Sequence, residues 1–252
     1  RYNILSKKIL ITGVAGFIGS HVARRFIEQK YEVYGIDDLS TGYKKNVPTE
    51  VKFIKADLAK KNTYKFLPKN CDYILHLAGQ SSGEISFSNP ISDLEKNTVS
   101  TIRLIKYGIK SKTKKFLFAS SMSVYGKLKK NKFKETDSCF PLSCYGTSKL
   151  SSEKYLEIFK EKLPYVSLRM FSVYGPGQDM KNLKQGMISI YLAQALKNKK
   201  VIVKGSLNRQ RDFIYIDDVV ECWFKAVVNK KCKNMIINVG TGKSVKVKKL
   251  LN

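Results

Sequence analysis

Tyr145 and Lys149 stand four residues apart in the segment Tyr145-Gly146-Thr147-Ser148-Lys149. On a helix these two positions share one face, so the ammonium of Lys149 would lie beside the phenol of Tyr145. An ammonium favours the phenolate, and we therefore expect the pKa of Tyr145 to fall from its reference of about 10 toward neutrality. Tyr145 could then act as a general base. Such a pair also arises by chance in helices, so its meaning depends on the rest of the chain.

A glycine-rich run is the second feature with chemical content. It lies between an apolar stretch and a segment of helical periodicity, and it reads Thr12-Gly13-Val14-Ala15-Gly16-Phe17-Ile18-Gly19. Strand, glycine turn and helix in this order are the context of a dinucleotide-binding motif. Gly13 permits the tight turn, Gly16 the approach of a pyrophosphate, and Gly19 close helix–strand packing. The pyrophosphate would bind the free N–H groups at the helix N-terminus.

Three further positions fit a nucleotide-dependent redox enzyme, each with a structural alternative. Asp37 ends the second expected strand, where a carboxylate accepts from adenosine ribose hydroxyls and favours NAD over NADP, although it could simply cap a loop. Ser120, Ser121 and Ser123 follow a strand end, where ligands bind in open α/β sheets, but turn formation explains serines equally well. Arg211 could clamp a diphosphate or pair with a nearby aspartate.

Composition narrows the class of protein. The chain has 252 residues, 43% of them hydrophobic, and a formal net charge of +27. Its lysines are scattered in twos and threes without a nucleic-acid-binding signature, so we interpret them as a solvated surface and expect no nucleic-acid partner. No apolar run is long enough to span a membrane, and we expect a cytoplasmic protein. Five cysteines without a CxxC pair, and two histidines, predict reduced thiols and no metal site.

Strand and helix patterns alternate through the first two thirds of the chain, which predicts βαβ units and a doubly wound parallel sheet of Rossmann type in an α/β fold. The expected strands are Lys8–Thr12, Glu32–Ile36, Val51–Ala56, Tyr73–Leu77, Lys115–Ala119 and Tyr165–Arg169, and the expected helical segments include Gly16–Gln29, Ile91–Lys110 and Tyr145–Lys162. A smaller C-terminal lobe should hold a helix at Met187–Lys197, a strand at Val201–Val203, a helix at Asp217–Asn229 and a helical chain end from Val245.

These motifs, in this order, resemble the extended short-chain dehydrogenase/reductase family and, within it, the NAD-dependent nucleotide-sugar epimerases and dehydratases, UDP-glucose 4-epimerase-like enzymes among them. The resemblance implies NAD as cofactor, a nucleoside diphosphate sugar as substrate and a homodimer formed through the second and third helical segments. It implies an NAD-binding Rossmann domain over residues 7–170. Residues 171–252 would form a partial substrate-binding lobe, interleaved with the last Rossmann elements and truncated at its C-terminus.

The resemblance also assigns roles to individual positions. Tyr145 would be the base, Lys149 would hold the nicotinamide ribose, and Ser121 would be the catalytic Ser/Thr. The substrate would contact Ser121, Ser123, Ser172 and Arg211, with Ser172 standing where the family usually has Asn. The cofactor would contact Gly13, Ala15, Gly16, Phe17, Ile18, Gly19, Asp37, Asp57, Leu58, Leu77, Ala78, Gly79, Asn97, Ser120, Tyr145, Lys149 and Phe171.

The residues after Ser121 bear on the reaction. In the resembled family, 4,6-dehydratases carry an acidic pair at the positions of Met122 and Ser123, and decarboxylases a glutamate at that of Ser123. Neither residue present can act as an acid or base at neutral pH. The sequence therefore favours epimerisation at C4 of a nucleoside diphosphate hexose. A reductase, dehydrogenase or 4,6-dehydratase of the same family, and a non-enzymatic NAD- or RNA-binding protein, remain as alternatives.

Overall fold

A computed structural model describes residues 6–126, 132–198 and 200–251 of the chain. Its main layer is a sheet of seven parallel strands in the order β3-β2-β1-β4-β5-β6-β9. The strands are β1 (Lys8–Thr12), β2 (Glu32–Asp37), β3 (Lys52–Lys55), β4 (Tyr73–His76), β5 (Lys115–Ser121), β6 (Tyr165–Met170) and β9 (Met235–Val239). The α/β fold with a doubly wound parallel sheet is confirmed.

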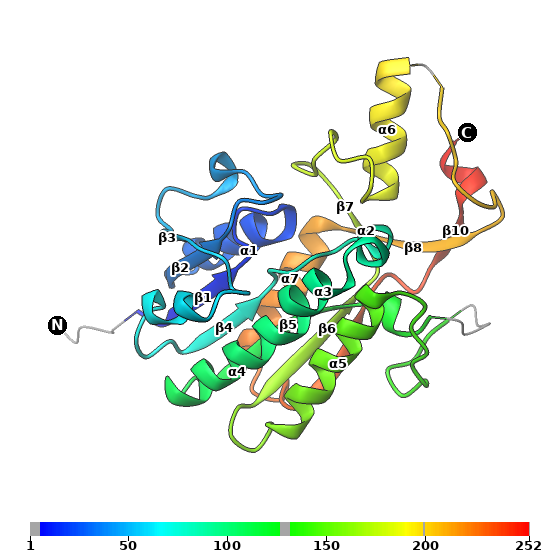
Figure 1. Cartoon of the computed structure of the whole chain (residues 1–252). Coiled ribbons are helices and arrows are strands. Elements are labelled where there is room, and N and C mark those ends of the chain that lie inside the picture. The colour runs from blue at the N-terminus through cyan, green and yellow to red at the C-terminus, as the bar shows by residue number, and fades with distance from the viewer. Residues whose placement is uncertain (1–5, 127–131, 199, 252) are drawn as a thin grey trace.

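Helices cover both faces of this sheet (Figure 1). One face packs against α1 (Phe17–Glu28) and α7 (Ile216–Val228), whose Phe26 and Trp223 are fully buried. The other face packs against α4 (Ser100–Lys110) and α5 (Cys144–Ile158). Two separate apolar clusters therefore hold the sheet between them, as expected for a doubly wound fold.

The segment before α4 is less regular than the expected single helix. The expected segment Ile91–Lys110 is helical throughout, but it consists of α3 (Pro90–Leu94) and a π-helical turn at Glu95–Val99 that runs directly into α4; a separate short helix, α2 (Gly83–Ser88), precedes it. A π turn inserts an extra residue into a helix and is frequent at functional sites. Here the turn carries Asn97 and Lys96 toward the carboxyl ends of the strands.

The remaining elements form the smaller lobe. A three-stranded sheet of order β10-β8-β7 joins β7 (Ser172–Tyr174), β8 (Gln210–Tyr215) and β10 (Ser244–Lys246), and α6 (Met187–Asn198) stands above it (Figure 1). Along the chain, α7 and β9 follow β8 and belong to the main sheet and its covering helices, and β10 then rejoins the small sheet. The lobe and the main sheet are therefore interleaved in the sequence.

Two expectations for the lobe are wrong. Val201–Val203 is not a strand: among the described residues it pairs with no strand, and the N–H of Ile202 donates to the side chain of Gln194 instead. The end of the chain forms β10 and a short 3-10 turn at Val247–Leu250 instead of an α-helix, because β10 pairs antiparallel with β8.

Candidate active site

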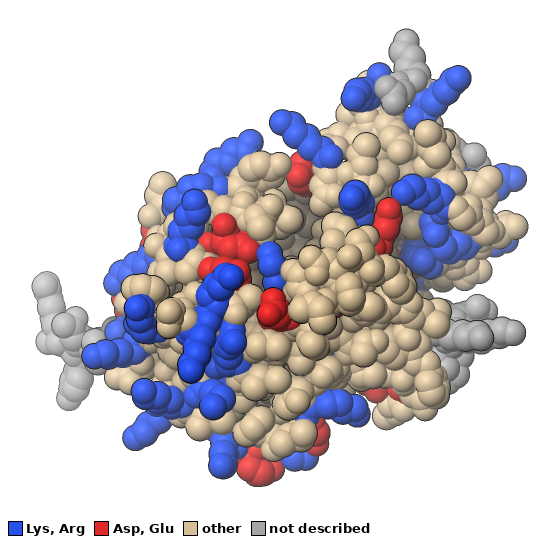
Figure 2. Space-filling view, viewed as in Figure 1, with Lys and Arg blue, Asp and Glu red and all other residues tan. Residues whose placement is uncertain are grey.

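A cavity of about 560 Å³ opens at the carboxyl ends of the parallel strands, between the main sheet and the lobe. It lies at the point where the strand order reverses between β1 and β4, which is where ligands bind in open α/β sheets. Figure 2 shows acidic side chains gathered at the hollow and lysines and arginines spread over the surrounding face; the carboxylates that line the cavity are Asp37, Asp38, Asp57 and Asp179.

Most of the predicted site residues line this one cavity. They are Gly13, Gly16, Phe17, Ile18, Gly19, Asp37, Asp57, Leu58, Leu77, Ala78, Gly79, Ser120, Ser121, Ser123, Tyr145, Lys149, Phe171, Ser172 and Arg211. Ala15 and Asn97 do not line it: the N–H of Ala15 is bound by Asp37, and Asn97 is buried behind Gly79. The placement brings residues from the glycine-rich turn, the strand ends and helix α5 together.

The glycine-rich turn leaves no space for side chains on its inner side. Gly13 has a positive φ of 69°, and a Cβ there would lie 2.7 Å from the backbone nitrogen of Ala78. A Cβ on Gly19 would lie 2.1 Å from the carbonyl oxygen of Gly13. Because α1 begins at Phe17 without a side-chain cap, its first N–H groups are free to bind an anion.

Asp37 is positioned by the backbone on both sides of it. Its carboxylate accepts from the N–H of Ala15 at 2.9 Å and from that of Leu39 at 2.8 Å. Each carboxylate oxygen keeps a further lone pair for a ribose hydroxyl. Burial raises the pKa of Asp37, against these two hydrogen bonds. Asp37 can therefore cap the loop and bind a ribose hydroxyl at the same time.

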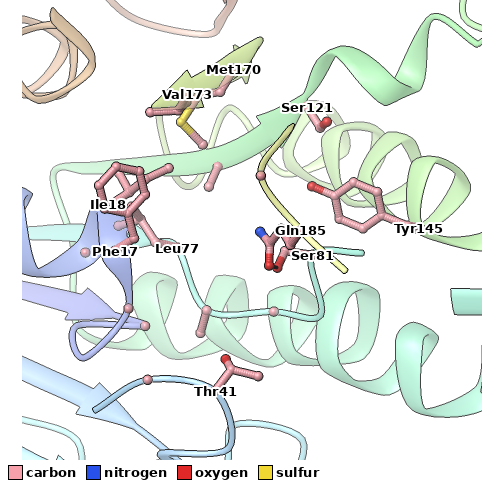
Figure 3. A pocket seen from close by; sticks show the side chains of 18 of the residues that line it. Phe17, Ile18, Thr41, Leu77, Ser81, Ser121, Tyr145, Met170, Val173 and Gln185 are labelled. Carbon is pink, nitrogen blue, oxygen red and sulfur yellow. Dashed lines mark hydrogen bonds between the residues drawn. The ribbon is translucent and has the colours of Figure 1, made fainter. Parts of the chain in front are cut away.

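Tyr145 and Ser121 face each other across one side of the cavity (Figure 3). Ser121 donates to the hydroxyl of Ser123 at 3.1 Å. Burial raises the pKa of Tyr145 to about 12, and the nearby hydroxyl of Ser121 acts in the opposite direction. The expectation that Lys149 brings this pKa toward neutrality is wrong for the protein groups alone, because burial and the charge of Asp93 both raise it.

Lys149 lies one helical turn beyond Tyr145 and is 4% exposed. Its Nζ stands 4.9 Å from the ring centre of Phe118 and 5.7 Å from that of Tyr145. Burial lowers the pKa of Lys149 to about 8, although Asp93 and Glu153 act in the opposite direction. A perturbed buried lysine at a cavity is typical of a functional site.

Arg211 reaches the cavity from strand β8 of the lobe. In the described part of the chain its guanidinium makes no ion pair, and it donates to the backbone oxygen of Gln210 at 2.8 Å. Asp212 instead accepts from the turn at Thr241 and Gly242. Burial, with Arg209 nearby, lowers the pKa of Arg211. The guanidinium is therefore available to an anion. The alternative, an ion pair of Arg211 with a nearby aspartate, does not form among the described residues.

Sequence patterns missed a second group of lining residues. Lys96 lies in the π turn and pairs with Asp38 at 3.2 Å, and the loop before α6 contributes Gln178, Asn182 and Gln185. Gln185 accepts from Ser81 at 2.9 Å, so this loop closes the cavity from the lobe side. No motif marks these positions, since their neighbours in space are far away in the sequence.

A family model described as the NAD dependent epimerase/dehydratase family matches residues 9–240. The chain belongs to this family. Its cofactor is accordingly NAD, and the glycine-rich turn and the spare lone pairs of Asp37 fit a dinucleotide. No helix in the described ranges is long and apolar enough to cross a membrane, and no group of three or more His, Cys, Asp or Glu among the same residues could hold a metal ion.

Solved structures of three epimerases are similar to this chain. The UDP-glucose 4-epimerase of Thermotoga maritima with UDP-glucose is 35% identical, with a TM-score of 0.91 over 96% of this chain and 80% of that one. The Thermus thermophilus UDP-glucose 4-epimerase with NAD is 32% identical, with a TM-score of 0.87 over 97% and 81%. The UDP-N-acetylglucosamine 4-epimerase of Methanobrevibacter ruminantium, with UDP-N-acetylmuramic acid, is 32% identical, with a TM-score of 0.90 over 97% and 80%.

Proposed function

We propose that the protein epimerises a nucleoside diphosphate sugar, a UDP-hexose, at C4. The observation that carries the proposal is that Tyr145 and Ser121 line the same cavity as the glycine-rich turn and Arg211. A base, a dinucleotide-binding turn and an anion-binding guanidinium are the three groups that this reaction requires. Two of the similar structures are UDP-glucose 4-epimerases and a third acts on UDP-N-acetylglucosamine, which supports a UDP-sugar as substrate.

Tyr145 and Ser121 handle the proton. The phenolate of Tyr145 removes the proton from the sugar 4-hydroxyl, and the hydroxyl of Ser121 donates a hydrogen bond to the reacting oxygen. Because burial holds the pKa of Tyr145 at about 12, the phenolate fraction rises with pH across the neutral range. The same tyrosine returns the proton once the sugar has presented its other face.

Four groups of the chain would hold the cofactor. The N–H groups at the start of α1 bind the pyrophosphate, Asp37 accepts from the adenosine ribose, and Asp57 and Leu58 border the adenine. Lys149 donates to the nicotinamide ribose. Held by these residues, NAD would supply reversible hydride transfer at C4 of the sugar.

The substrate diphosphate is bound by Arg211, whose guanidinium offers a bidentate pair of donors. Ser172 lines the same part of the cavity with a shorter side chain than the asparagine common in the family. Residues 171–252 would accordingly act as the substrate lobe, and residues 7–170 as the NAD-binding domain.

The residues beside Ser121 favour epimerisation over elimination of water. Met122 and Ser123 line the cavity, and neither supplies the additional acid and base that a dehydratase needs. A reductase or dehydrogenase would use the same Tyr145 and Lys149 but consume or release NADH in proportion to product. A protein that only binds NAD or RNA would not require Tyr145, Lys149 and Ser121 to line one cavity.

We also propose that the protein is a homodimer in the cytoplasm. Ile91, Leu94 and Ile158 on α3 and α5 are exposed, at 66%, 44% and 71% of their side-chain surfaces. Exposed apolar residues on neighbouring helices are typical of protein interfaces. Light scattering on the purified chain would give a dimer mass; a monomer at micromolar concentration would contradict this arrangement.

Product analysis by NMR tests the proposed function. The purified protein is incubated with UDP-glucose, UDP-galactose and their N-acetyl forms, with NAD in trace amount. Interconversion at C4 without net NADH is the expected result and identifies the sugar. Stoichiometric NADH would favour a dehydrogenase, and a 4-keto-6-deoxy product would favour a dehydratase. Tyr145→Phe serves as the negative control.

A further inference from the structure

The ammonium of Lys149 is buried without a direct counter-ion. Within the described ranges no carboxylate lies at ion-pair distance from its Nζ, which lies near the rings of Phe118 and Tyr145 and beside Gly79. Burying a charge without a partner is costly, and a lysine in this position tends to lose its proton. Something in the surroundings must hold Lys149 in its charged form if it is to bind a ribose as an ammonium.

Two carboxylates act on Lys149 from a distance, and they differ in their own partners. Glu153 accepts from Arg169 at both of its oxygens, at 2.9 and 2.7 Å, so its charge is matched by a guanidinium. Asp93 is fully buried and accepts from neutral donors: Gln80 at 2.9 Å, Asn97 at 3.0 Å and Ser148 at 2.7 Å. The charge of Asp93 is therefore not cancelled by any of the groups that bind it.

The other titratable groups around Lys149 do not replace Asp93. His76 on β4 is neutral, because burial lowers its pKa to about 3, with Lys149 as a second cause. Tyr145 on α5 is protonated at neutral pH, since its pKa is about 12. Arg169 on β6 is bound to Glu153 and forms a neutral pair with it. Among these groups only Asp93 offers Lys149 an uncompensated negative charge.

Asp93 also joins the segments that build the site. Its Oδ2 accepts from Ser148, the neighbour of Lys149 on α5, and its Oδ1 accepts from Gln80, which follows Gly79 in the loop after β4. Oδ1 further accepts from Asn97 in the π turn, whose own Oδ1 is buried beside Gly79 without a hydrogen-bond partner. One carboxylate thus fixes α5, the π turn and the loop that borders the cavity.

We propose that Asp93 is a positioning residue that acts through Lys149: its carboxylate keeps the buried ammonium charged and holds helix α5 against the loop after β4. Only the expected effect on catalysis rests on the proposed function. The charge of Lys149 can be measured in the purified protein whether or not a substrate is known.

Asp93→Asn tests the proposal because the amide is nearly isosteric. Its oxygen can still accept from Gln80 and Asn97, and its NH2 can donate to the hydroxyl of Ser148. The side-chain amine of Lys149 is titrated by NMR in 15N-lysine-labelled protein, with Lys149→Arg used to assign the signal. We expect the pKa to fall from about 8 to about 7 or below, so that the ammonium fraction at pH 8 falls about fivefold.

Glu157→Gln is the matched control. Glu157 lies on the same helix, but it pairs with Lys160 at the surface, and its loss should leave the titration of Lys149 unchanged. In a protein that epimerises UDP-sugars, the alkaline fall of kcat/KM should move to lower pH in Asp93→Asn by the same amount as the Lys149 titration. If no sugar is turned over but the titration shifts, the proposed function fails and the role of Asp93 stands.

A folded Asp93→Asn variant in which Lys149 titrates as in the wild type would overturn the proposal. Should the variant not fold, carboxyl 13C NMR of the wild-type protein decides instead. The carboxyl signal of Asp93 is followed from pH 6 to pH 9, and a carboxylate signal over that range supports the proposal. An Asp93 carboxyl that is protonated over this range carries no charge to act on Lys149, and the proposal would then be wrong.

Discussion

Helix α5 carries two buried charges one turn apart, and their surroundings differ. Lys149 and Glu153 are 4% and 3% exposed. Glu153 accepts two hydrogen bonds from Arg169 and a third from Ser120. Lys149 has no ion pair in the part of the chain that the structure describes, and burial lowers its pKa to about 8. The paired charge faces the interior between β5 and β6, whereas the unpaired one lines the cavity.

The comparison separates two kinds of buried charge. The paired charge of Glu153 stabilises the fold, whereas the unpaired charge of Lys149 serves the site. A fully bonded buried pair is costly to break, because removing one partner leaves the other charge uncompensated. An unpaired buried ammonium lowers stability, and it is retained where a ligand needs it. The first two turns of α5 should therefore respond to mutation in activity, and the third turn in stability.

Glu153→Gln should produce the largest loss of stability. The substitution leaves the Arg169 guanidinium buried without its carboxylate, and we expect the free energy of unfolding to fall by about 3–5 kcal/mol. For a chain of this size each kcal/mol lowers Tm by about 2–4 °C. Thermal denaturation followed by circular dichroism measures the change. A Tm within 2 °C or so of wild type would mean that Glu153 and Arg169 do not stabilise the fold as a pair.

Lys149→Met should have the opposite effect on stability while removing activity. Because the pKa of Lys149 is lowered from 10.5 to about 8, the folded protein binds this proton less readily than the unfolded chain. The resulting cost is present in full below pH 8, is relieved as pH rises from 8 to 10.5, and is absent above that range. At pH 6 the variant should be more stable than wild type by up to about 3 kcal/mol.

Urea denaturation at pH 6, 8 and 10 tests the direction of this stability difference and its dependence on pH. The advantage of Lys149→Met over wild type should shrink as the pH rises. A variant that is less stable at pH 6, or an advantage that does not depend on pH, would contradict the view that burial of the Lys149 ammonium without a direct ion pair costs stability.

Glu157→Gln should have the smallest effect. Glu157 accepts from Lys160 at 2.6 Å, but both side chains are well exposed, at 47% and 39%. Exposed ion pairs contribute about 0–1 kcal/mol. We expect a change of about 0.5 kcal/mol in the free energy of unfolding, decreasing with added salt. An effect as large as that of Glu153→Gln would remove the distinction between the two parts of the helix.

The main sheet could be predicted from sequence because its strands are buried and locally continuous. Lys8–Thr12 is strand β1 as expected, and the glycine turn leads into α1 within one residue of the expected start. The lobe was harder because its strands are short and half-exposed, so that they lack a strong apolar pattern. Strand β8, for example, is defined by its pairing with β7 and β10, whose paired residues lie about 41 and 34 positions away.

The site could be predicted only where a motif names the residue. Tyr145, Lys149 and the glycines carry such a motif, and the structure places them at one cavity. No motif marks Asp93, because its contacts with Ser148 and Gln80 span 55 and 13 residues of sequence and form only in the packed fold. The sequence also predicts the wrong direction for the pKa of Tyr145. Spacing along the helix shows which side chains are neighbours, but it does not show how deeply they are buried.

Transfer of a label at C4 tests the central claim most directly. The protein is incubated with trace NAD and a UDP-sugar that is deuterated at C4, and the product is examined by NMR. If Tyr145 acts as the base in an oxidation and reduction at C4, the product is the C4 epimer, it keeps its deuterium at C4, and Tyr145→Phe forms none of it. Deuterium lost to water, or found at C6 of a 4-keto-6-deoxy product, would contradict epimerisation by this site.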